Sequence, residues 1–162
     1  MAPTGLDYLT LGVAVFGAVT GAVAIGVQVV SFVLSGPRVK VTASANFHTG
    51  NRLWFLGIGT ANVGRGPVTI QGVGVQLGGG KHIPVGGFLP AYVGPELPYR
   101  PEPGAEATWL VQPEPLLETV RREGEPGVVR VYANLASGTR VSSQTKQDLD
   151  GFVNSNAEES GG

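Results

Sequence analysis

Residues 38–77 read RVKVTASANFHTGNRLWFLGIGTANVGRGPVTIQGVGVQL, and this stretch decides the fold class. Residues 38–47 alternate between apolar and polar side chains, which is the pattern of a strand with one buried face. The side chains expected to be buried are Val39, Val41, Ala43, Ala45 and Phe47. Turn residues at 48–51 then lead to a second strand, residues 52–62, which is apolar on both faces around Trp54.

A third strand is predicted over residues 67–77, with an irregularity near its start. Its apolar phase slips by one residue at positions 71–72, which indicates a β-bulge. The three glycines at 78–80 are typical of a tight hairpin turn, so a short fourth strand is expected over residues 81–85. These patterns together predict a run of antiparallel strands.

The C-terminal half adds further strands and one short helix. The strands are predicted over residues 105–111, 128–135 and 139–143, and the helix over residues 115–123. About seven short strands joined by turns predict a small antiparallel immunoglobulin-like β-sandwich over residues 38–145. A partly open barrel is the alternative. The polar residues 146–162 are expected to form a tail that is disordered from residue 154 onward.

Composition fits one turn-rich domain and excludes several chemistries. Gly contributes 26 and Pro 12 of the 162 residues, which suits short strands and many turns. The net charge of −1 gives no reason to expect a nucleic-acid partner. The charges are uneven, because only basic ones occur from Arg38 to Lys81 and acidic ones follow from Glu96 onward. The chain has no Cys, so disulfides, thiolate metal sites and thiol nucleophiles are excluded.

The N-terminal part predicts a transmembrane helix over residues 9–34, preceded by a tail of residues 1–8. No charge occurs from Tyr8 to Pro37, and a helix over residues 9–34 would reach about 39 Å, more than the hydrocarbon core of a bilayer needs. A cleaved secretory signal is the alternative. It would need a basic start and a shorter apolar run, whereas this chain offers only Asp7 before a long one. We therefore expect the lipid bilayer as a partner.

Basic residues beside the span predict the side on which the domain lies. Arg38, Lys40 and Arg52 follow the C-terminal end of the helix, whereas the N-terminal side has only the α-amine and Asp7. The positive-inside rule therefore predicts a single-pass protein of the cell membrane with its domain in the cytoplasm. The linker is limited to residues 35–37, so the domain is expected close to the lipid headgroups.

Small residues recur along the predicted span. Gly17 and Gly21 form a GxxxG pattern, which lets two helices approach closely and favours a homo-oligomer formed through this face. The alternative is that Gly and Ala are common in membrane helices and carry no pairing function. Gly17 and Gly21 are therefore the candidate residues for helix pairing.

The loop after residue 85 contains more apolar residues than a surface connection usually does. Phe88, Leu89, Tyr92 and Val93 lie between glycines and prolines in residues 86–97. One interpretation is that these side chains fold inward and close one end of the domain. The other is that they stay partly exposed and bind a protein partner or the bilayer interface. These four residues are the candidate partner-binding site.

No motif for catalysis, cofactor binding or metal binding is found in the sequence. The glycine-rich segment ending at Lys81 has Val75 and His82 where a phosphate-binding loop needs Gly and then Ser or Thr. The two histidines, His48 and His82, lack the spacing of a zinc site. The glutamates of residues 114–125 fit the solvated face of a short helix. We therefore expect a protein that is not an enzyme and that uses no cofactor and no metal.

Three stretches carry a resemblance to a known kind of protein. They are SGPRVKV at residues 35–41, NVGRGPVTI at residues 62–70 and PGAEATW at residues 103–109. After a spanning helix, this order resembles uncharacterised membrane-anchored immunoglobulin-like β-sandwich proteins of high-GC bacteria. The turn in the second stretch is also similar to the strand-turn-strand of adhesion-type immunoglobulin-like domains. The resemblance covers roughly residues 9–145 and implies a fold and a location, without an activity.

Two classes of function fit these expectations. The first is a membrane-anchored, non-enzymatic module that binds a protein partner. The alternative is a structural or adhesive β-sandwich displayed on a cell surface or in a viral particle. The two differ in topology, because the first places the domain inside the cell and the second places it outside or in an assembled shell.

Overall fold

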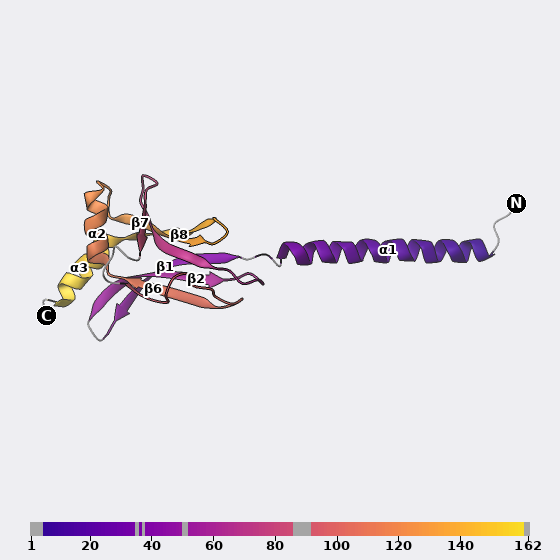
Figure 1. Ribbon diagram of the computed structural model, residues 1–162, viewed down its shortest axis with the longest axis horizontal. Coiled ribbons are helices and arrows are strands. Elements are labelled where there is room, and N and C mark those ends of the chain that lie inside the picture. The colour runs from indigo at the N-terminus through magenta and orange to yellow at the C-terminus, as the bar shows by residue number, and fades with distance from the viewer. Residues whose placement is uncertain (1–4, 35, 37, 50–51, 86–91, 161–162) are drawn as a thin grey trace. The chain divides into compact units, whose positions relative to one another are not determined.

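The computed structural model describes residues 5–34, 36, 38–49, 52–85 and 92–160. Its contacts divide the chain into two compact units, residues 1–36 and residues 37–162. Figure 1 shows both units and labels most of their helices and strands. The first unit contains one helix, and the second is mainly β with two antiparallel sheets.

The first unit consists of helix α1 (Gly5–Leu34), which begins before residue 9, where the sequence analysis placed its start. The 24 residues of Leu9–Phe32 are long and apolar enough to cross a membrane. At the usual helical rise their length is about 36 Å, compared with about 30 Å for the hydrocarbon core. Large apolar side chains are exposed along the helix, Phe16 and Phe32 among them. The Thr20 hydroxyl donates to the Phe16 carbonyl at 2.8 Å, so this polar group is satisfied within the helix.

The second unit, called the β domain below, contains two four-stranded sheets. Sheet A has the order β1 (Val39–His48), β2 (Leu53–Asn62), β6 (Glu106–Val111) and β5 (Tyr92–Val93). Sheet B has the order β4 (His82–Val85), β3 (Ile70–Gln76), β7 (Val128–Leu135) and β8 (Arg140–Asp148). Helices α2 (Pro113–Arg122) and α3 (Leu149–Ser160) lie together at one end of the sheets (Figure 1). All strand pairs are antiparallel, as the sequence predicted.

One hydrophobic core joins both sheets and both short helices. Sheet A contributes Leu56, Ile58 and Trp109, and sheet B contributes Val73, Val75 and Val131, all almost completely buried. Leu116, Leu117 and Val120 of α2 and Leu149 of α3 close the same core. The amphipathic spacing of the apolar residues in α2 explains why this helix lies against the sheets. The core therefore holds together elements from residue 39 to the C-terminal helix.

Two features of the predicted strands are confirmed, and one is wrong. Strand β2 is buried on both faces, and the pairing of β3 with β7 shifts register between Ile70 and Gly72, where a bulge was predicted. Strand β1 buries Val41 as expected, but Ala45 and Phe47 are exposed. The reason is that the core ends before them, and Ala45 lines an open hollow of about 360 Å³ instead.

The C-terminal residues correct the expectation of a polar tail with a disordered end. Strand β8 continues to Asp148, and residues 149–160 form helix α3. Leu149 and Phe152 are buried in the core, and Val153 packs against it. Apolar residues at this spacing share one face of a helix, which the overall polar composition of the segment conceals. The β domain therefore extends beyond residue 145, and α2 is one of its two described helices.

Candidate functional site

The glycines proposed for helix pairing lie on an open strip of α1. A side-chain carbon added at Gly17 or Gly21 would have no neighbour within 4 Å, and the same holds at Gly12 and Gly26. Gly17 and Gly21 are one helical turn apart, so they share a face. A second helix could approach the α1 backbone closely along this face. Pairing through Gly17 and Gly21 stays a prediction.

The predicted partner-binding residues fall partly on a strand. Phe88 and Leu89 lie outside the described residues. Tyr92 and Val93 form β5, whose register places them opposite Val111 and Leu110 of β6. The Val93 side chain is 67% exposed, on the outermost strand of sheet A. This strand was not predicted, because two residues are too few for a periodic pattern.

The residues that follow β5 are tied to the core through Trp109. A side-chain carbon at Gly94 would lie 2.5 Å from the Trp109 ring, so only glycine fits there. The Trp109 indole N–H donates to the Pro95 carbonyl at 2.9 Å. The Tyr99 ring packs edge-on against Trp109 with a centroid distance of 6.1 Å. Gly94, Pro95 and Tyr99 thus contact the core residue Trp109, whereas the Val93 side chain faces outward.

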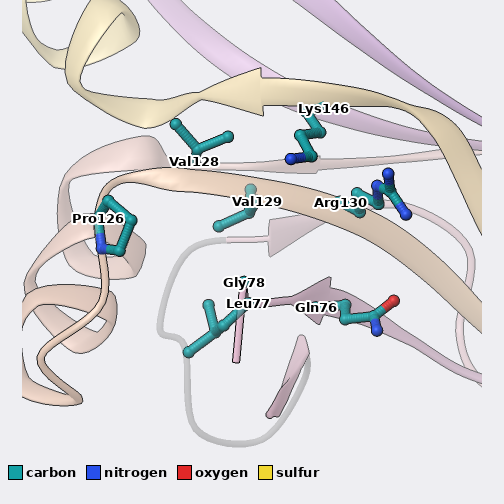
Figure 2. A pocket seen from close by; sticks show the side chains of 8 residues that line it. All are labelled: Gln76, Leu77, Gly78, Pro126, Val128, Val129, Arg130 and Lys146. Atoms are coloured by element: carbon teal, nitrogen blue, oxygen red, sulfur yellow. The ribbon is translucent and has the colours of Figure 1, made fainter. Parts of the chain in front are cut away.

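Sheet B contains a hollow of about 300 Å³ that the sequence analysis did not predict. It is lined by the end of β3, the start of β7 and one residue of β8, which are Gln76, Leu77, Gly78, Pro126, Val128, Val129, Arg130 and Lys146 (Figure 2). Leu77 and Val129 are buried, whereas Arg130 and Lys146 are exposed. Leu77 and Val129 belong to the core, so the accessible lining of the hollow combines the cations with the exposed apolar Pro126 and Val128. We call it the sheet B hollow.

Strand register aligns the polar residues of the sheet B hollow. Gln76 of β3 lies opposite Arg130 of β7, and Arg130 lies opposite Lys146 of β8. The register of β7 and β8 shifts immediately after this pair. Among the described residues, ion pairs join Lys81 with Glu123 and Arg121 with Asp150, so neither Arg130 nor Lys146 takes part in one. Gln76, Arg130 and Lys146 thus form a row across three strands, and this row places two positive charges side by side.

Other polar groups on the same face of sheet B are already engaged. The Arg140 guanidinium lies 4.7 Å from the centroid of the Tyr132 ring and donates from Nε to Asn134 Oδ1 at 2.8 Å. Burial raises the pKa of the Tyr132 hydroxyl, and the Arg140 charge opposes this shift. Desolvation and then the Arg140 charge lower the pKa of His82, which packs edge-on against Tyr132. Arg140 is therefore already held by Tyr132 and Asn134.

The described residues contain no cluster suited to a metal ion, and neither the family models nor the curated proteins include a match to this chain. In the part of the chain that the structure describes, no three His, Cys, Asp or Glu side chains lie close enough to hold a metal ion.

Proposed function

We propose that this protein is a single-pass membrane protein whose β domain is a non-enzymatic interaction module at the cytoplasmic face of the cell membrane. The observation that carries the proposal is the exposed apolar surface of α1 from Leu9 to Phe32. In water these apolar side chains would be exposed to solvent, whereas the bilayer core accommodates them. Arg38 and Lys40 follow the helix directly, and the positive-inside rule favours the inner side for such residues.

We also propose that the β domain has the immunoglobulin-like arrangement. If its strands are lettered A, B, C, C′, D, E, F and G in chain order, the two sheets read ABED and C′CFG. Immunoglobulin domains pair an ABED sheet with a CFG sheet, and variable-type domains extend the second sheet with C′. This order supports the resemblance to membrane-anchored immunoglobulin-like proteins. A barrel fits less well, because hydrogen bonds join the described strands into two separate sheets.

The interaction role is supported by surfaces suited to contact. The exposed Val93 side chain at the edge of sheet A is proposed to bind a protein partner, together with the sequence candidates Phe88, Leu89 and Tyr92. The open glycine strip of α1 is proposed to pair with a second copy of the chain. The first contact would be made by the β domain and the second by α1. Because the chain is proposed to be held at the membrane, a partner in the same membrane is at high effective concentration.

Alkaline extraction of cell membranes tests the anchor. The protein is expected to stay in the membrane pellet, because α1 is long enough to span the bilayer. Substituting both Val19→Arg and Val23→Arg should move it to the soluble fraction, since each charge at the centre of a span costs roughly 2.5 to 3.5 kcal/mol on insertion scales. Val93→Arg, which adds a charge to the exposed edge of sheet A, is the matched control and should remain in the pellet. Release of the unaltered protein by alkali would contradict the proposal.

Single-cysteine labelling tests the orientation, because the chain contains no Cys of its own. Ser137→Cys places a thiol in the exposed turn between β7 and β8. A membrane-impermeant maleimide is expected to label this variant only after the cells are opened. Thr4→Cys, before the helix, should be labelled in intact cells. The opposite result at both positions would reverse the orientation and favour the surface-displayed adhesive or structural role.

A further inference from the structure

We propose that the sheet B hollow is a binding site for the phosphate group of a small phosphomonoester, held by Arg130, Lys146 and Gln76. The inference rests on the β domain alone and is independent of the membrane anchor. Three properties of the hollow support it: the register of its polar residues, two cations that take part in no ion pair among the described residues, and its size and apolar lining.

Register brings three hydrogen-bond donors to one place. Gln76, Arg130 and Lys146 are cross-strand neighbours on β3, β7 and β8, and all three line the hollow in Figure 2. Residues directly opposite on antiparallel strands have Cβ atoms about 4.5 to 5.5 Å apart, within reach of a single ligand. An Arg guanidinium offers a planar fork of donors and a Lys ammonium a compact charge, which are the groups that proteins use for phosphate.

The amide of Gln76 is held in an orientation that leaves its N–H groups for a ligand. Its Oε1 accepts a hydrogen bond from the Ser142 hydroxyl at 3.4 Å. Because a Gln amide has one acceptor oxygen and two N–H donors on its nitrogen, engagement of the oxygen turns the donors away from Ser142. The site would thus combine two charged donors with one neutral donor.

The two positive charges of Arg130 and Lys146 favour the binding of an anion with two negative charges. Like charges directly opposite on neighbouring strands destabilise a sheet, and Arg130 faces Lys146 in this way. Arg140, on the same face, is instead stacked over Tyr132 and bonded to Asn134. A carboxylate would neutralise one cation of the row, whereas a phosphate dianion would neutralise both. A phosphate group is therefore the ligand that best relieves the repulsion.

Two carboxylates lie near the hollow, and their negative charges lower its affinity for a phosphate group. Asp148, opposite Val128 and beyond Lys146 on β8, accepts a hydrogen bond from the Asp150 backbone N–H at 3.1 Å. The Glu125 carboxylate lies against Gly79 in the turn after β3. Neither lines the hollow itself. Removing the charge of Asp148 should therefore strengthen binding, which gives the experiment a variant with the opposite sign.

The size and apolar lining of the hollow favour a phosphate ester over the free ion. Its volume of about 300 Å³ is larger than a phosphate needs, and the exposed Pro126 and Val128 offer apolar contacts to an attached organic group. Small-molecule sites in proteins commonly combine a mostly apolar wall with a few placed polar groups. The register shift beside the row is also typical of strands that border a site.

Titration of the full chain in a neutral detergent, with inorganic phosphate and with glycerol 3-phosphate as probes, tests the proposal. Isothermal calorimetry at low ionic strength should detect binding of both probes, with the ester bound more tightly. Arg130→Gln should weaken binding by at least about tenfold, the double variant with Lys146→Gln should abolish it, and Asp148→Asn should strengthen it. Each variant should melt no lower than the parent, because Arg130→Gln and Lys146→Gln relieve repulsion between the strands. This result separates loss of the site from loss of the fold.

Two controls separate a local site from a general attraction for anions. Lys40→Gln removes the same charge from sheet A and should leave the affinity within about twofold. Arg140→Gln removes a charge from the same face of sheet B but from outside the row, and it should have a similarly small effect. If Arg140→Gln weakens binding as much as Arg130→Gln, or if the Arg130 and Lys146 double variant still binds, the proposed site is wrong.

The source of the phosphate group is distinguished with the same full chain in nanodiscs. A soluble ester is indicated if glycerol 3-phosphate binds equally well in detergent and in phosphatidylcholine discs. A lipid headgroup is indicated if discs that contain phosphatidic acid compete with glycerol 3-phosphate and this competition requires Arg130. Absence of binding to every one of these probes would overturn the proposal.

Discussion

Trp109→Ala is expected to lower the free energy of unfolding of the β domain by about 3 to 5 kcal/mol, the usual cost of truncating a large buried aromatic side chain. Trp109 is fully buried at the centre of sheet A. Its ring fills the space over Gly94 and contacts the edge of Tyr99, and its indole N–H holds the Pro95 carbonyl. The substitution would therefore open a cavity and also release the segment that follows β5.

Denaturant titration of the full chain in detergent measures this loss, with Trp54 as the remaining fluorophore. Trp54→Ala is the comparison, because Trp54 is only partly buried and should cost less. Trp109→Phe fills most of the volume but cannot donate to Pro95, so it should fall between the parent and Trp109→Ala. An unfolding midpoint unchanged by Trp109→Ala would mean that sheet A is wrongly described.

Asn156→Ala is expected to cost about 2 to 4 kcal/mol, although it changes a small side chain near the end of the chain. The Asn156 carboxamide accepts from the Trp54 backbone N–H at 2.6 Å and donates to the Trp54 carbonyl at 3.3 Å. It also donates to the Glu114 carboxylate of α2. Strand β6 pairs with β2 only from Leu56 onward, so Asn156 completes the hydrogen bonding of β2 beyond the end of β6.

The cost arises because the substitution leaves partly buried backbone groups of Trp54 without these partners. Asn154→Ala, which removes an exposed Asn from the same helix, is the matched control and should cost less than about 0.5 kcal/mol. Asn156→Asp keeps the acceptor but loses both donors and sets a carboxylate beside Glu114, so it should not restore stability. Hydrogen exchange at the Trp54 amide provides a local measurement. Continued strong protection of that amide in Asn156→Ala would contradict the role given to this side chain.

The parts of the fold that were predicted correctly are those that depend on a sequence pattern within a single segment. The alternation around Val41, the two-sided apolar strand around Leu56 and the phase slip at Gly72 each depend on neighbours in sequence. The mainly β class, the antiparallel pairing and the apolar N-terminal helix followed from such patterns. The C-terminal end of α1 was predicted at residue 34 because an uninterrupted apolar run has few alternatives, whereas the helix begins before residue 9, where its start was predicted.

The parts that could not be predicted depend on contacts between distant segments. Helix α3 has a polar composition, and Leu149 and Phe152 become recognisable as core residues only when the sheets provide a surface for them. The exposure of Phe47 follows from where the core ends, which no residue of β1 reveals. The row of Gln76, Arg130 and Lys146 exists because of strand register, and register is not set by any one of these strands.

The bond between Trp54 and Asn156 also has a consequence for biosynthesis. It joins residues that are 102 positions apart, so strand β2 emerges from the ribosome long before the side chain that completes it. Sheet B has the same property, since β3 must wait for β7 and β8. A nascent chain that stops before Leu149 therefore carries strands with open edges and an incomplete core, the condition in which β-rich chains aggregate. The domain is therefore expected to be protected from misassembly only after helix α3 has been synthesised.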